Sequence, residues 1–149
     1  MKRSILLAVM ACIAMVLAPL ALHAQQPGKH PAYLHALQDL RHARAHIERQ
    51  PGDAQRKWDE RVAVHEIDEA IREIKEAAID DGKNLADHPP VDAKMEWHGR
   101  LHRALELLHK AEKDCHEEED NNFAHGLQRR ALEHIRKAIN FTEQGLANR

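Results

Sequence analysis

Histidine is the residue type that suggests chemistry in this sequence, which contains 13 histidines among 149 residues. Imidazole nitrogen binds borderline divalent metals such as Zn, Cu and Ni, and histidines four residues apart lie on one side of a helix. His98 and His102 have this spacing inside an apolar-periodic stretch from Trp97 to Cys115. We expect this pair to border the buried face of a helix and to form the candidate metal site.

A second pair, His42 and His46, has the same spacing. It lies about 130° from the apolar stripe of its predicted helix, so we expect it to face water. We treat it as the alternative metal site. Either pair supplies only two ligands, whereas a tight site needs more. The competing interpretation is that the histidines form a polar border, hydrogen-bonded to neighbouring Asp and Glu residues.

His134 falls near the middle of the apolar face predicted for the last helix. A histidine there could serve as an axial ligand in a non-covalent haem or redox bundle, which is an alternative function. The first predicted helix offers no Met as a second axial ligand. Glu112 is expected at the same level on the preceding helix. We therefore predict a core polar contact of His134 or Arg130 with Glu112.

Sequence motifs of enzymatic chemistry do not occur here: there is no C-x-x-C-H, P-loop, G-x-G-x-x-G or H-E-x-x-H. Glu106 and His109 have the E-x-x-H spacing of di-iron bundles, but Leu105 and Leu108 are predicted to face the core, which turns Glu106 outward. No residue is assigned a catalytic role. The leading prediction is a non-enzymatic protein with a binding or structural role, and Zn, Cu or Ni binding is its most concrete form.

Trp58 and Val62 suggest a different function, that of a protein-interaction module. They lie almost opposite the core face predicted for their helix. Either the helix is irregular near its start, or the N-terminal lead-in or a partner covers a second surface there. A second copy of the chain, giving a homodimer, or another protein would fit.

The elements that position these residues are four amphipathic stretches, predicted as helices over 31–49, 53–79, 92–119 and 122–146, with Asp53 as an N-cap. Turn residues such as Pro51 and Gly52 separate them. Two similar helical hairpins packed together predict an all-α, antiparallel up-down-up-down four-helix bundle. The first and third helices share one apolar pattern at a constant offset. The predicted core includes Tyr33, Ala36, Leu37, Leu40, Ala43, Ile47, Ala63, Val64, Ile67, Ala70, Ile71, Ile74, Leu101, Leu105, Leu108, Phe123, Leu127, Ala131, Ile135 and Phe141.

Composition supports a helical fold, and the charge argues against two classes of binding partner. Aromatic residues make up 3% of the chain, and the formal net charge is −2 with both signs interspersed. Few aromatics and many Ala, Leu, Glu and Lys residues favour helix over strand. The nearly neutral charge argues against nucleic acid or an anionic membrane as a partner.

The N-terminus has the features of a secretory signal peptide over residues 1–24, cleaved after Ala24. A basic Lys2-Arg3 pair precedes an apolar run from Ile5 to Leu22. We therefore expect residues 25–30 as a flexible lead-in, a bundle domain over 31–146, and a periplasmic or secreted protein without membrane contact after cleavage. Cys115 would be the one cysteine of that protein, and we expect it in the core.

Export predicts a defined mature N-terminus. The intact mass of the protein recovered from its host should correspond to a chain that begins at Gln25. A product that retains residues 1–24 would contradict the predicted localisation.

Overall fold

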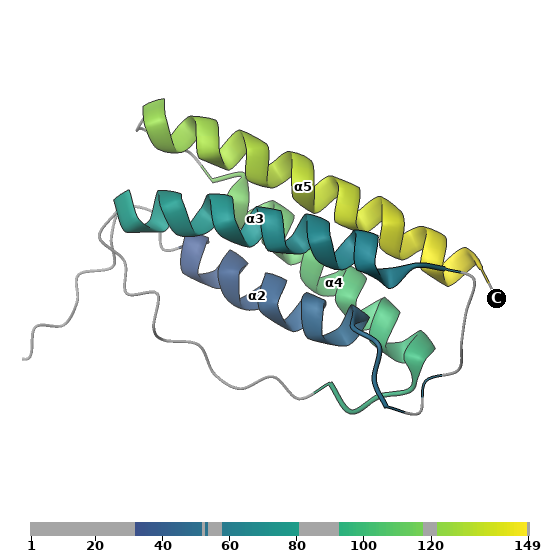
Figure 1. Cartoon of the computed structure of the whole chain (residues 1–149). Coiled ribbons are helices and arrows are strands. Elements are labelled where there is room, and N and C mark those ends of the chain that lie inside the picture. Colours follow the sequence, from purple (N-terminus) through teal and green to yellow (C-terminus); the bar gives the residue numbers. More distant parts are fainter. Residues whose placement is uncertain (1–31, 52, 54–57, 81–92, 118–121, 149) are drawn as a thin grey trace, which may run out of the picture.

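The all-α fold class is confirmed by a computed structural model, which describes residues 32–51, 53, 58–80, 93–117 and 122–148. This part of the chain forms four helices and no strand (Figure 1). The helices are α2 (Ala32–Ile47), α3 (Glu60–Asp80), α4 (Trp97–Cys115) and α5 (Asn122–Ala147). The predicted signal peptide and lead-in lie outside the described residues. None of the described helices is both long and apolar enough to span a membrane.

The start of α3 differs from the predicted start of the second helix, and an N-cap residue explains where it lies. Helix α3 begins at Glu60, not at residue 53, so the prediction of Asp53 as its N-cap is wrong. Asp59 takes this position: its carboxylate accepts a hydrogen bond from the backbone N–H of Arg61 at 3.1 Å. Hydrogen bonds from the Arg61 side chain and backbone lower the pKa of Asp59 to about 2.

Helix α4 is also shorter than predicted. It begins at Trp97, after an extended Glu96 (φ −61°, ψ 150°), and ends at Cys115. Its C-terminal end is closed by a side chain from α5: the amide nitrogen of Gln128 donates to the carbonyl oxygens of Cys115 and Glu117, both at 2.7 Å. The carbonyl group of Cys115 is one of the last in α4 and has no partner within the helix, so a buried glutamine satisfies it.

The helices pack as a bundle in which each one has two neighbours. Helix α3 packs mainly against α5, and α2 mainly against α4, while the α2–α3 and α4–α5 contacts are less extensive. The most extensive contacts therefore join helices that do not follow one another in the sequence.

The chain order of the bundle differs from the predicted up-down-up-down order. Arg49, just after α2, pairs with Glu60 at the start of α3 at 3.1 Å. Arg100 in the first turn of α4 donates to the carbonyl oxygen of His46 near the end of α2 at 3.2 Å. Helices α3 and α4 thus start at the same end and run parallel, while each pair of neighbouring helices is antiparallel (Figure 1). The order is up-down-down-up.

The length of one connection explains this difference. The prediction packed two successive helical hairpins together, so that every helix would be antiparallel to the one before it. Between Asp80 and Trp97 there are 16 residues. At roughly 3.3 Å per residue they can reach about 50 Å, whereas α3, with 21 residues at a rise of about 1.5 Å each, is only about 32 Å long. The chain is therefore able to return to the end where α3 began.

The core agrees with the predicted apolar faces apart from five positions, of which Val64, Ile71 and Phe141 are partly buried and pack against its edge. Leu105 is only partly buried and packs against the edge of the core, while Leu107 is buried in addition. Phe123 is 64% exposed because it lies in the first turn of α5, at the end of the bundle. The remaining predicted core positions are buried: Tyr33, Ala36, Leu37, Leu40, Ala43, Ile47, Ala63, Ile67, Ala70, Ile74, Leu101, Leu108, Leu127, Ala131 and Ile135.

Leu108 and Leu105 give a matched test of the core. Leu108 is fully buried, so Leu108→Ala should lower the free energy of unfolding by about 2–5 kcal/mol through lost burial and a residual cavity. Leu105→Ala on the same helix should cost clearly less. Urea denaturation of both variants measures the difference. Equal losses would contradict the observed orientation of α4.

Candidate functional site

The structure brings His98 and His102 together on the surface of α4. Their ring centroids are 5.3 Å apart with an angle of 56° between the ring planes. Both side chains are exposed, so the pair does not border the core as predicted. Neither ring makes a hydrogen bond or an ion pair within the described ranges. The two imidazoles are therefore available to a ligand from solvent.

Two further histidines, His109 in α4 and His116 just after it, already contact side chains of this protein. His109 Nδ1 lies 3.8 Å from the Glu112 carboxylate. His116 Nε2 accepts a hydrogen bond from Arg136 of α5 at 2.9 Å. His98 and His102 thus differ from His109 and His116, whose rings have side-chain partners. Within the described residues, no group of three or more His, Cys, Asp or Glu side chains is arranged to hold a metal ion.

The alternative pair, His42 and His46, does not face water as predicted. His46 is 5% exposed and His42 is half-buried, because α4 packs against this side of α2. Asp39, one turn before His42, reflects the same environment: burial raises its pKa, and Lys110 of α4 partly offsets this shift. A metal ion at this pair would have to displace part of α4. The exposed pair on α4 is the better candidate.

His134 binds a different carboxylate from the one predicted. Its Nδ1 lies 2.7 Å from Glu66 of α3, and its side chain is 22% exposed. It therefore lies at the rim of the α3–α5 interface and not in the centre of the bundle. The predicted contact with Glu112 is wrong because α5 turns this side toward α3, its main neighbour.

Arg130 also pairs with α3, and the predicted Arg130–Glu112 contact is likewise wrong. Arg130 Nη2 lies 2.8 Å from the carboxylate of Glu73, whose side chain is only 3% exposed. Arg72 binds the other oxygen of Glu73 at 2.9 Å. Glu112 of α4 instead binds Arg136 at 2.8 Å, on the opposite side of α5. These polar contacts join α5 to both of its neighbouring helices.

The interaction surface predicted at Trp58 and Val62 is reduced to Val62. Trp58 is 7% exposed, and it is covered by residues of its own chain. Its ring packs edge-to-face against Trp97 at 5.5 Å, and a Cβ at Gly145 would come within 2.8 Å of it. Trp58 precedes α3, so the helical periodicity used for the prediction does not apply to it. Val62 remains 37% exposed.

A buried arginine, missed by the sequence analysis, organises this end of the bundle. Arg100 is 3% exposed and forms a short ion pair with Asp53. It also donates to the carbonyl oxygens of His46 (3.2 Å) and Met95 (3.4 Å). Its guanidinium carbon lies 5.5 Å from the centroid of the Trp97 ring. The only sequence signal was an arginine at the edge of an apolar stripe, where most arginines are solvated.

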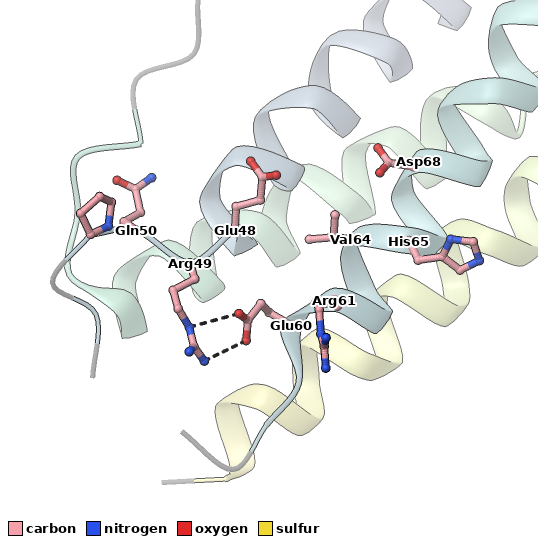
Figure 2. A pocket seen from close by; sticks show the side chains of 9 residues that line it. Glu48, Arg49, Gln50, Glu60, Arg61, Val64, His65 and Asp68 are labelled. Atoms are coloured by element: carbon pink, nitrogen blue, oxygen red, sulfur yellow. Dashed lines mark hydrogen bonds and ion pairs between the residues drawn. The ribbon is translucent and has the colours of Figure 1, made fainter. Parts of the chain in front are cut away.

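The end of α2 and the start of α3 border an open groove of about 670 Å³ (Figure 2). Acidic and basic side chains line this groove, and they already form ion pairs with other side chains of the protein. Arg49 contacts Glu60, as the dashed lines in Figure 2 show, and Asp68 accepts from Arg44 at 2.7 Å. A ligand in this groove would have to replace these pairs. The groove is therefore a weaker candidate than the exposed histidines.

Cys115 is fully buried, as predicted, and carries a free thiol. Burial raises the pKa of this thiol to about 12. The thiolate is the reactive form of cysteine, so this side chain acts as a small core hydrophobe at neutral pH.

Comparison with protein-family models, with curated proteins and with solved structures finds no match for this chain.

The Arg100–Asp53 pair predicts a large and localised stability effect. Arg100→Met should lower the free energy of unfolding by about 3–5 kcal/mol, because it leaves a largely buried carboxylate without its cation. Arg103→Met, one turn on with a half-exposed side chain paired to Glu106, should cost less than about 1 kcal/mol. Urea unfolding of both variants is the measurement. Similar losses would show that the pair contributes no more than a surface contact.

Proposed function

We propose that this protein is an exported, non-enzymatic binding protein that takes up a borderline divalent cation, Zn, Cu or Ni, at His98 and His102. The observation that carries this proposal is the position of the two rings, one helical turn apart, exposed and 5.3 Å between centroids. Neutral imidazole is a preferred ligand of these ions.

The geometry also limits the strength of binding. A tetrahedral ion needs four ligands, and the pair supplies two. Water can fill the remaining positions, so we expect affinity no tighter than micromolar. Binding should weaken in acid, because a protonated imidazole no longer coordinates a metal. Such a site suits uptake or transient binding of an ion more than a permanent structural centre.

Features of the sequence support the rest of this proposal. The basic, apolar and small-residue segments of residues 1–24 favour a cleaved signal peptide and a periplasmic or secreted location. The net charge of −2 argues against nucleic acid as the partner. On α4, the exposed side chains of His98 and His102 support access of an ion from solvent.

Calorimetric titration of the untagged protein with Zn²⁺ and Ni²⁺ tests the proposal. The wild type should bind one ion per chain, and His98→Ala/His102→Ala should abolish binding. The control His35→Ala/His125→Ala removes two exposed histidines on other helices and should bind as the wild type does. Unchanged binding in the first variant would overturn the proposal.

A further inference from the structure

The histidine pair on α4 supplies half of a tetrahedral metal site. His98 and His102 offer two imidazoles, whereas a tetrahedral ion takes four ligands. Both side chains are exposed, and within the described ranges no third His, Cys, Asp or Glu is arranged to join them. The open side of a bound ion would therefore face away from the protein, toward any molecule that approaches this surface of α4.

The two rings are close enough to chelate one ion. At a metal–nitrogen distance of about 2.05 Å, two nitrogens of a tetrahedral site lie about 3.3 Å apart. The ring centroids of His98 and His102 are 5.3 Å apart, and the nitrogens lie at the ring edges. Exposed side chains rotate readily, so one nitrogen of each ring can reach the required separation.

A glycine beside the pair leaves room for a close neighbour. Gly99 lies within α4, and at about 100° per residue it is about 60° from His102 around the helix axis. Glycine inside a helix is less stable than alanine. A Cβ at Gly99 would meet no atom within 4 Å outside the surrounding stretch of α4, so packing within the chain does not require glycine here. Without a side chain at this position, the backbone of a second molecule can approach the ion.

The charges that flank the pair are balanced. Arg103 Nη1 lies 2.6 Å from the carboxylate of Glu106, so these two opposite charges form a pair next to His102. Lys94 and Glu96, both exposed just before α4, add one charge of each sign. An identical surface that faces this one therefore brings equal numbers of positive and negative groups, and no like-charge repulsion opposes its approach.

We propose, on the basis of the metal site proposed above, that a second copy of this chain completes the site. A single Zn²⁺ then bridges two chains through His98 and His102 of each. A two-fold axis through the ion relates identical surfaces, as in most homodimers. It gives the ion four imidazoles in the tetrahedral geometry in which zinc is usually bound. The second pair of imidazoles replaces the water ligands of the single-chain complex.

The ratio of ion to protein then controls assembly. When chains outnumber ions, two chains share one ion. When ions are in excess, each histidine pair takes its own ion, and water completes the coordination. The dimer should therefore be most abundant at half an ion per chain and should decline as more Zn²⁺ is added. The end point of a calorimetric titration remains one ion per chain.

Sedimentation velocity of the untagged protein at increasing Zn²⁺ tests this inference. The protein should be monomeric in a chelator, dimeric at half an ion per chain and monomeric again in excess Zn²⁺. Gly99→Gln fills the space beside the pair but keeps both ligands, so it should weaken dimerisation roughly tenfold or more through a clash with the second copy. It should change Zn²⁺ binding to the single chain less than about twofold. The matched control Gly126→Gln on α5, where a Cβ makes only an ordinary contact with Arg130 at 3.7 Å, should dimerise as the wild type does.

Each other outcome has a defined meaning. A wild type that binds Zn²⁺ but stays monomeric at every ratio would overturn the bridged dimer and leave the histidine site standing. A dimer that persists in excess Zn²⁺, in the chelator or in His98→Ala/His102→Ala would also overturn it, since a shared ion explains none of these results. Equal dimerisation of Gly99→Gln and the wild type would overturn the close approach at Gly99. A wild type that does not bind Zn²⁺ would refute both this inference and the proposed function.

Discussion

The buried guanidinium of Arg100 is the interaction on which one end of the bundle depends. It binds the carboxylate of Asp53 and the carbonyl oxygen of His46 near the end of α2, so it holds the start of α4 against the end of α2. A buried charge is costly unless its donors are satisfied, and here side-chain and backbone acceptors satisfy them. The same residue binds the Met95 carbonyl group and thereby shapes the chain that leads to His98.

Helices α3 and α5 are joined by polar side-chain contacts in addition to their apolar packing. Along the α3–α5 interface, Glu66 meets His134 and the buried Glu73 meets Arg130, so a row of polar contacts runs beside the apolar core. This row sets the pairing of α5 with α3. Because α2 likewise pairs mainly with α4, the bundle consists of two antiparallel pairs whose members are separated in the sequence.

Two histidine pairs with the same spacing have opposite environments in this bundle. His46 is buried under α4, whereas His98 and His102 are exposed. Spacing places two rings on one side of a helix, but the neighbouring helix decides whether that side meets water. The same principle explains Glu112, whose partner depends on which edge of α5 faces α4. Access to a ligand is thus a property of helix packing.

The sequence by itself determined the helical fold class, most core positions and the burial of Cys115, because apolar periodicity and turn residues act locally. It also identified His98 and His102 as a pair. The tertiary structure alone decided the up-down-down-up order, the partners of His134 and Arg130, the covering of Trp58 and the burial of Arg100. Those features depend on which helices meet across the bundle. A connection long enough to return along the bundle permits more than one arrangement, so local patterns do not specify it.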